Sequence, residues 1–524
     1  MNDARRSLWL SDPRPHFPTL EASITVDVAV IGGGITGLTT AHLLKAAGKS
    51  VAVVELGTIG QGASGNTTAK LTVGHGLIYA ELLREHNEEV ARDYADSNRA
   101  AIDRIEQIVA EAGIVCDFER ADNYVYTESS DRVAAIEDEQ RAARRTGIEA
   151  VLTTETDLPF PVLAAIRIEN QAQFHPGKYL AGLAERIAGD GSSVFEHTRA
   201  TGVRRGDVET ASGEIRARHV VVATHLPFLD RGLFFAKAHP AKSYAIAAPV
   251  DEGAAPRGMY ISVEEPTRSI RSTPGPDGSR YLVVGGEGHK VGDDPDTERR
   301  YAALERFLRE RFGGDPEYRW SAHDYVAVDH LPYIGRLSCR DERIYVATGF
   351  AKWGLTKATF AAEIITDTIL GRRNGFAGVY DATRRTARGS AGTLVRENVH
   401  VARHFFGDRV RSRPGRHAVE RLQPGEGTIA RLGGRVYAVY RDPEGKLHSL
   451  SPRCTHLGCL VTWNGADQTW ECPCHGSCFS GGGGLIEGPA TRDLQVRQLP
   501  DSSQLLLRPL RALHRVHHLG RAQK

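Results

Sequence analysis

Two short boxes of cysteine and histidine near the carboxyl end carry the clearest chemistry in this chain. The first runs from Cys454 to Cys459 as Cys-Thr-His-Leu-Gly-Cys, and the second begins after twelve intervening residues at Cys472 as Cys-Pro-Cys-His-Gly-Ser. Two thiolates and two neutral imidazoles on two loops suit a two-iron two-sulfur cluster in which histidines bind one iron. Tetrahedral zinc takes the same ligand types, so a Cys2His2 zinc site is the alternative. The predicted metal ligands are Cys454, His456, Cys472 and His475.

The remaining cysteines of the boxes, Cys459 and Cys474, sit at matched places and could bridge the two loops, which a zinc site would not need. With this pair included, the boxes resemble those of Rieske iron-sulfur proteins of the cytochrome bc type. The resemblance covers residues 419–510 and implies a disulfide between these two cysteines. It also implies that the loop Gly488-Pro-Ala490 covers the cluster.

The resemblance extends to residues that tune the potential of the cluster. In the family a serine and a tyrosine hydroxyl donate hydrogen bonds to cluster or ligand sulfur, which stabilises the reduced, more negative state. Ser477 matches the serine, whereas Phe479 stands where the tyrosine would be. We therefore expect a potential in the middle of the Rieske range of roughly −150 to +300 mV.

A glycine-rich turn near the amino end predicts a dinucleotide site. Residues 24–31 form a strand pattern, Gly32-Gly-Gly-Ile-Thr-Gly37 follows, and residues 38–47 read as a helix. A second strand, at 51–54, ends at Glu55. Glycines let the backbone approach a pyrophosphate at the positive helix N-terminus, and an acidic residue after the next strand binds ribose hydroxyls. This context makes a chance strand-turn-helix the weaker interpretation.

The segments that follow resemble the D-amino-acid oxidase, glycine oxidase and sarcosine oxidase superfamily over residues 24–385. They include Gly60-Gln-Gly-Ala-Ser-Gly65, Gln171 to Pro176, Val220 to Thr224, Leu331 to Gly335 and Ala347 to Thr356. The resemblance implies FAD, with the last segment opening a helix toward the flavin. The cofactor-binding residues that it implies are Gly32, Gly34, Ile35, Thr36, Gly37, Glu55, Gly62, Ala63, Ser64, Gly349, Gly354, Leu355 and Thr356.

Two regions, 76–150 and 240–320, correspond to the substrate-binding sheet and helices of that superfamily. Residues 80–112 and 131–146 are charged and helical in pattern, which indicates amphipathic surface helices. Each pocket candidate has a structural residue as its alternative; they are Thr67, Thr68, Lys70, His75, Tyr244, Arg271, His323, Lys352 and Trp353. Lys70 and Arg271 would suit a substrate carboxylate. The predicted catalytic residues are Lys352, Trp353, Tyr244 and Arg271.

Length and composition set the domain organisation. The 524 residues predict two or three domains, and 66 basic against 65 acidic side chains suggest no nucleic-acid partner. Residues 1–385 are expected to form an α/β (α+β) oxidoreductase with FAD-binding parts at about 24–75, 150–240 and 320–385. A linker with a helix at 386–418, a small all-β Rieske domain at 419–510 and a basic tail at 511–524 follow.

Local sequence patterns predict the cellular compartment and the state of the two remaining cysteines. Arg5-Arg6 is followed by Pro13, Pro15 and Pro18 without an apolar run, so we expect a solvated N-terminus, no membrane span and a cytoplasmic protein. The two cysteines outside 454–478, Cys116 and Cys339, are read as ordinary buried or surface thiols.

Together these features predict an FAD-dependent oxidoreductase that oxidises a C–N bond of an amine or amino acid. Electrons would pass through the 2Fe-2S cluster to a one-electron acceptor protein or oxygen. A ring-hydroxylating oxygenase needs a second iron in a large domain after the cluster, and only 49 residues follow His475. The alternative is a non-catalytic electron-transfer or redox-sensing protein.

Overall fold

The computed structural model describes residues 6–294, 296–384 and 414–500, with a few separate residues between 392 and 399. The chain divides into two compact units. One comprises Met1–Val291 and Thr297–Val399, and the other comprises Gly292–Asp296 and His400–Lys524. Among the described residues, the first unit holds two large sheets and the second holds two small ones.

A largely parallel sheet organises the first unit, in the order β16-β17-β10-β1-β2-β7 with β8 and β9 beside it. Strands β17, β10, β1, β2 and β7 run parallel, so the loops after β1, β10 and β17 share one edge. The apolar run at the end of β1 is fully buried, as expected for a central parallel strand. The strands are β1 (Ile24–Ile31), β2 (Val51–Val54), β7 (Ser193–Phe195), β8 (Ala200–Arg204), β9 (Asp207–Thr210), β10 (Glu214–Val222), β16 (Tyr333–Arg336) and β17 (Ile344–Thr348).

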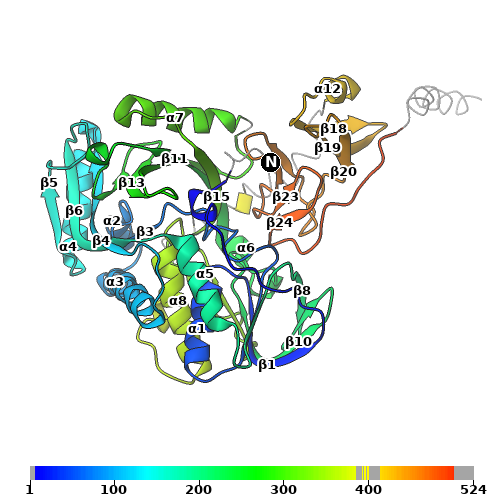
Figure 1. The fold of residues 1–524 in the computed structure, drawn as a ribbon, viewed down its shortest axis with the longest axis horizontal. Coiled ribbons are helices and arrows are strands. Elements are labelled where there is room, and N and C mark those ends of the chain that lie inside the picture. The colour runs from blue at the N-terminus through cyan, green and yellow to red at the C-terminus, as the bar shows by residue number, and fades with distance from the viewer. Residues whose placement is uncertain are drawn as a thin grey trace, which may run out of the picture. The chain divides into compact units, whose positions relative to one another are not determined.

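Helices α1 (Ile35–Ala46), α5 (Pro176–Ile187) and α8 (Gly354–Ile369) lie side by side in Figure 1, and α3 (Glu88–Ala112) packs against α8. The ends of α3 follow from its sequence. The Asn87 side chain accepts a hydrogen bond from the Val90 N–H at the start, and Gly113 takes a left-handed conformation at the end.

The second large sheet is mostly antiparallel, in the order β15-β11-β14-β13-β12-β4-β6-β3 with β5 beside β6. It takes in β3, β5, β6 and β15, which lie in ranges that the sequence assigned to the FAD-binding part, because pairing partners far along the chain leave no local signal. Its strands are β3 (Lys70–Leu71), β4 (Glu119–Thr127), β5 (Ala150–Thr153), β6 (Ala164–Gln173), β11 (Ala238–Pro249), β12 (Met259–Ser262), β13 (Arg268–Pro274), β14 (Arg280–Lys290) and β15 (Tyr318–Ala327).

Helices accompany this sheet where the sequence predicts amphipathic patterns. Helix α7 packs on β11 and β14, and α4 packs on β5 and β6, while α2 contacts α3 and α4. The charged stretches at 80–112 and 131–146 are helical, as predicted. The bounds are α2 (Ile78–Glu85), α4 (Val133–Arg145) and α7 (Glu298–Phe312), with short helices at α6 (Phe234–Lys237) and α9 (Ala377–Tyr380).

Part of the N-terminal segment is buried, which corrects the prediction of a solvated N-terminus. Ser7, Leu8 and Trp9 are buried, and a short 3-10 helix spans Leu8–Leu10. The Trp9 indole N–H donates to the Thr67 carbonyl over 2.7 Å, and Arg14 donates to the Ile59 carbonyl over 2.8 Å. The prolines, which suggested an extended solvated stretch, instead accompany a segment that packs on the loop after β2.

The second unit is a small β domain with a three-stranded sheet, β18-β19-β20, and a four-stranded sheet, β21-β22-β23-β24. With the first unit it confirms the predicted fold class, an α/β part with an antiparallel substrate-type sheet followed by an all-β part. Most of the predicted linker at 386–418 and the whole of the tail at 511–524 lie outside the described residues. The bounds are α12 (Arg416–Glu420), β18 (Gly427–Leu432), β19 (Arg435–Arg441), β20 (Leu447–Leu450), β21 (Thr462–Asn464), β22 (Thr469–Glu471), β23 (Cys478–Ser480) and β24 (Leu485–Glu487).

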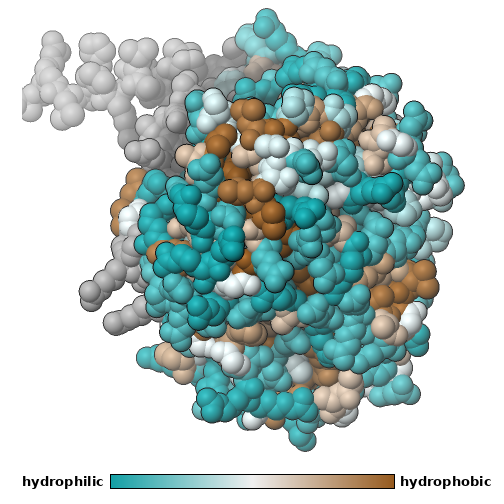
Figure 2. Space-filling view, turned by 90° about the vertical axis from the view of Figure 1, so that its left-hand side faces the viewer, coloured by the Kyte–Doolittle hydropathy of each residue, from teal (hydrophilic) through white to brown (hydrophobic). Residues whose placement is uncertain are grey.

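Hydrophilic side chains predominate on the face shown in Figure 2. Among the residues that the structure describes, no helix combines the length and the apolar character needed to cross a bilayer.

Candidate functional site

The glycine turn after β1 leaves backbone exposed where a pyrophosphate would lie. Gly32 has a φ of +113°, and a Cβ there would lie 2.4 Å from the Ala223 carbonyl oxygen. A Cβ at Gly34 would lie 2.9 Å from the Ser64 hydroxyl. Both positions therefore require glycine, the first for its backbone conformation and the second for the space in front of α1.

Two polar side chains brace this turn. Glu55 Oε2 accepts a hydrogen bond from the Gly33 N–H at 2.7 Å, and its Oε1 accepts one from the Gly57 N–H at 2.9 Å. Ser64 Oγ accepts a hydrogen bond from the N–H of Ile35, the first residue of α1, at 3.0 Å. Burial raises the pKa of the Glu55 carboxyl. The predicted residues of the turn, of the strand end and of the 62–64 loop are thus brought together at one helix N-terminus.

A second loop, which follows β17, reaches the same edge of the parallel sheet. Gly349, Ala351 and Lys352 have φ values of +81°, +53° and +68°. Left-handed conformations at alanine and lysine cost energy and occur where the surrounding structure holds them, often at functional sites. The loop leads into α8 at Gly354, and the Thr356 hydroxyl donates to Asn98 Oδ1 over 2.7 Å. The residues predicted to face a flavin therefore form a constrained helix entry.

The antiparallel sheet holds this loop from the other side. Asp324 of β15 accepts the backbone N–H of Lys352 through Oδ2, and its Oδ1 lies 3.1 Å from His225 Nε2. The Lys352 ammonium lies against Gly288 of β14, since a Cβ there would be 2.4 Å from Nζ. Burial lowers the pKa of Lys352. Lys352 and Trp353 thus lie where the two sheets of the first unit meet.

Sequence reasoning missed Asp324 and His225, which position this loop. Asp324 carries no motif, and its partner Lys352 is 28 positions away. His225 follows the apolar end of β10, and a polar residue just beyond a parallel strand is the signal that could have found it.

Tyr244 and Arg271 differ in what they contact. The Tyr244 hydroxyl lies 3.0 Å from His289 Nε2, and the two rings stack. Arg271 Nη1 donates to the Ala69 and Phe174 carbonyls at 2.6 and 3.2 Å, and the guanidinium lies over the Trp9 ring. Backbone carbonyls and an aromatic face therefore contact Arg271, and its role toward a substrate carboxylate stays a prediction.

Lys70 is occupied in the same manner. It is buried, and its Nζ donates to the Tyr260 carbonyl over 2.5 Å. Burial lowers the pKa of Lys70 well below its ordinary value. This hydrogen bond ties β3 to β12, so the lysine joins two strands of the antiparallel sheet.

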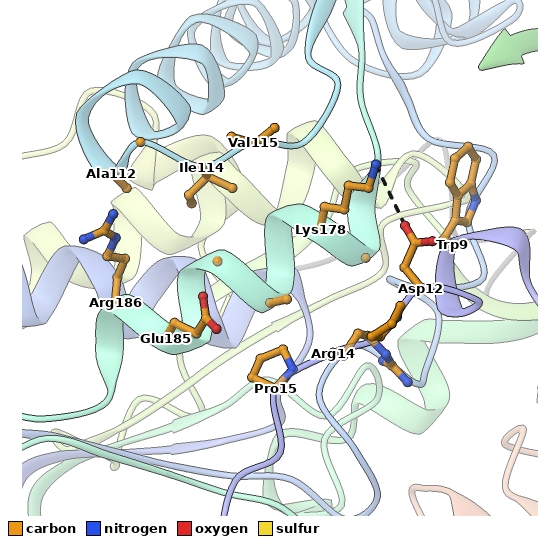
Figure 3. A pocket seen from close by; sticks show the side chains of 15 residues that line it. Trp9, Asp12, Arg14, Pro15, Ala112, Ile114, Val115, Lys178, Glu185 and Arg186 are labelled. Atoms are coloured by element: carbon orange, nitrogen blue, oxygen red, sulfur yellow. Dashed lines mark ion pairs between the residues drawn. The ribbon is translucent and has the colours of Figure 1, made fainter. Parts of the chain in front are cut away.

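Figure 3 shows a pocket of about 460 Å³ between the N-terminal segment, the end of α3 and α5. Its wall mixes both signs of charge, with Asp12, Lys178, Glu185 and Arg186 around Ile114. Lys178 pairs with Asp12 at 3.8 Å. None of the predicted site residues lines this pocket, so we do not assign it to the substrate.

In the second unit the two cysteine-histidine boxes converge. Cys454, Cys472 and His475 are buried, and the rings of His456 and His475 meet edge to face with centroids 5.0 Å apart. A hydrogen bond from the Cys472 thiol lowers the pKa of Cys454, with further hydrogen bonds from the His456 N–H and the Ser477 hydroxyl. Burial lowers the pKa of His475 to about 3, so its imidazole is neutral, as a metal ligand requires.

The surroundings of the boxes match the expectations drawn from the Rieske resemblance. Cys459 and Cys474 form a disulfide, as predicted. Ser477 Oγ hydrogen-bonds Cys454 and accepts the Ala490 N–H at 3.0 Å, which ties the Gly-Pro-Ala loop to Cys454. Phe479 is fully buried in the core that contains the cysteines. Cys116 is buried and Cys339 exposed, both as free thiols.

These two sites fit the groups predicted for them. The turn before α1 has open backbone and a carboxylate for an adenosine dinucleotide, and the helix entry at Gly354 offers N–H groups to its other end. The boxes supply two thiols, two imidazoles and backbone N–H groups that point at the sulfurs. Such a donor set suits a cluster with two unlike irons.

Comparison with known proteins supports both assignments. Residues 27–368 match the family described as DAO, FAD dependent oxidoreductase, and residues 416–500 match the Rieske [2Fe-2S] domain. A Bacillus subtilis (strain 168) protein, YhfW, named for a Rieske 2Fe-2S iron-sulfur centre, is 35% identical over 94% of this chain and 97% of its own length.

Two further relatives match the larger part. Gamma-glutamylputrescine oxidoreductase of Escherichia coli (strain K12) is 24% identical over 69% of this chain and 87% of its own length. The crystal structure of glycine oxidase from Bacillus cereus ATCC 14579 superposes with a TM-score of 0.57 over 69% of this chain and all of that chain, at 19% identity. At that identity the likeness shows the fold.

Proposed function

This chain belongs to the DAO family of FAD-dependent oxidoreductases and carries a C-terminal Rieske [2Fe-2S] domain. From that premise we propose that it oxidises the C–N bond of an amine or amino acid and passes the electrons from FAD through the cluster to an external one-electron acceptor. The relatives named for gamma-glutamylputrescine and glycine support an amine substrate, and they leave its identity to experiment.

The observation that carries the proposal is the presence of both redox sites, each complete in its donors, in one chain. FAD, when bound, takes two electrons from a substrate and can release them singly, and the cluster accepts one electron at a time. Gly32, Gly34 and Glu55 would hold the adenosine and pyrophosphate part. The N-terminus of α8 would stabilise negative charge at the flavin end.

The residues at the meeting of the two sheets would bind and orient the substrate. Asp324 of β15 holds the backbone of Lys352, and the Lys352 side chain lies against Gly288. The Lys352 amine, whose pKa is lowered by burial, therefore lies beside the N-terminus of α8. Tyr244 brings a hydroxyl from β11, aligned by His289. Tyr244 is buried, which strengthens its polar contact with His289.

Around the cluster, the protein's own residues set its affinity for electrons. Cys454, His456, Cys472 and His475 would bind the two irons, and Ser477 donates a hydrogen bond to Cys454 sulfur. The disulfide between Cys459 and Cys474 joins the two loops that carry these ligands. The domain boundaries at 385 and 419 remain part of the proposal.

Anaerobic titration of the purified holoprotein with a panel of amines and amino acids tests the enzymatic proposal. Flavin absorbance should bleach with at least one compound, and the matching carbonyl product should accumulate in equal amount. Dithionite serves as the positive control for a reducible flavin. Bleaching by dithionite but by no amine would favour the non-catalytic electron carrier or redox sensor.

A further inference from the structure

His75 is a buried histidine beside the loop that links the two sheets of the first unit. It follows β3, its side chain is 6% exposed, and its ring stacks on Trp353 with centroids 4.4 Å apart and planes 22° apart. Trp353 is the residue before α8, next to Lys352. His75 thus lies at the carboxyl edge of the parallel sheet, where open α/β sheets bind their ligands.

The two ring nitrogens of His75 have different surroundings. Nδ1 lies 2.7 Å from the Tyr94 hydroxyl. Nε2 is buried, and no residue in the described part of the chain hydrogen-bonds it. Since buried polar atoms in folded proteins almost always have partners, Nε2 keeps the capacity for one hydrogen bond to a bound molecule.

The ring is neutral, and its proton can be assigned. Burial and the nearby Lys357 hold the pKa of His75 well below its ordinary value. The Thr72 carbonyl also faces the ring. A carbonyl only accepts hydrogen bonds and Nε2 makes none, so we place the proton on Nδ1 and the lone pair on Nε2.

The surrounding groups keep this arrangement in place. Lys357 Nζ donates to the Phe350 carbonyl at 2.9 Å and lies 5.1 Å from the centroid of the Tyr94 ring. Tyr94 is itself fully buried in α3. Because a lone pair accepts only from a donor, Nε2 suits an N–H group rather than a carboxylate.

We infer that His75 Nε2 accepts a hydrogen bond from the amino N–H of the bound substrate. The inference rests on the proposed function, and it names a side chain that contacts the substrate nitrogen. A substrate held in this manner has its nitrogen lone pair free to form the C=N bond.

The test compares wild type with His75→Leu, using the best amine from the panel and its N,N-dimethyl derivative, which has no N–H. Dissociation constants are measured from the perturbation of the oxidised flavin spectrum. His75→Leu should bind the amine about tenfold more weakly, the equivalent of one hydrogen bond, with FAD content unchanged. Wild type should bind the dimethyl derivative more weakly by a similar factor, and the variant should bind both compounds alike.

Two further variants keep the result interpretable. His75→Gln retains a side-chain acceptor and should recover part of the affinity, and it replaces the leucine variant if that one does not fold. His42→Leu, a partly buried histidine on α1, is the matched control and should bind like wild type.

The inference is overturned if wild type and His75→Leu distinguish the amine from its N,N-dimethyl derivative by the same factor. Loss of FAD from the His75 variants, with His42→Leu intact, would do so as well, because Nε2 would then face the cofactor. If no amine reduces wild-type flavin, the proposed function fails first, and that outcome is distinct from unaltered binding in the variant.

Discussion

The cluster boxes and the substrate side of the antiparallel sheet are built in opposite ways. All four predicted iron ligands lie within residues 454–475, and the backbone of the same two loops hydrogen-bonds their sulfurs. The substrate side joins groups far apart in sequence, such as Asp324 with Lys352 and His75 with Trp353. A site made of short loops can be recognised from spacing, whereas a site made by distant strands requires the tertiary structure.

The largest effect is expected at the glycine turn that would bind FAD, which like the cluster boxes is built from short loops. Gly34→Val should abolish FAD binding, since even a Cβ at this position would lie 2.9 Å from Ser64 Oγ and would fill the space in front of α1. FAD content after purification is the measurement. Gly253→Val, where a Cβ meets nothing within 4 Å, is the control. A Gly34→Val protein with a full complement of FAD would show that the turn does not hold the cofactor.

Arg271→Met tests the region that is assembled from distant strands of the antiparallel sheet. The change leaves the Ala69 and Phe174 carbonyls without their charged donor, so the free energy of unfolding should fall by about 3 kcal/mol. Substrate affinity of the folded protein should change little. Chemical denaturation gives the first quantity and flavin titration the second. A selective loss of substrate binding at unaltered stability would support the carboxylate role predicted from sequence.

Lys357 is expected to make the free energy of unfolding depend on pH. Burial lowers its pKa in the folded protein to about 7, so between pH 7 and about 10 the unfolded chain binds a proton that the folded protein does not. The free energy of unfolding should therefore rise with pH over this window, by at most about 1.4 kcal/mol per unit. Lys357→Met should lack this increment. Parallel slopes for the two proteins would mean that the lysine titrates normally.

The smallest effect is expected at the cluster. Ser477→Ala removes the hydroxyl that hydrogen-bonds Cys454 and should lower the potential by about 60 mV, a tenfold change for a one-electron couple. Phe479→Tyr should raise it by adding a hydroxyl to the core around the cysteines. Redox titration followed by electron paramagnetic resonance gives both values. Unchanged potentials would show that neither side chain reaches sulfur.

The outcome of the sequence predictions follows the same physical division. The strand predicted at 24–31 is β1 to the residue, because an apolar run followed by a glycine turn is a local signal. The disulfide was accessible through the family resemblance. The buried N-terminus and the contacts of Arg271 could not be predicted, since Trp9 meets Thr67 across 58 positions and Arg271 meets Ala69 across 202. Contacts of that separation depend on strand order, which periodicity does not encode.

The central claim is that electrons leave the flavin through the cluster, and His456→Ala tests it most directly. Loss of a ligand should empty the cluster site, and His417→Ala, an exposed histidine of the same unit, is the matched control. Stopped-flow reduction by substrate should keep its wild-type rate in both variants. Turnover with ferricytochrome c should fall by more than about 100-fold in His456→Ala alone. Full turnover without a cluster would contradict the claim.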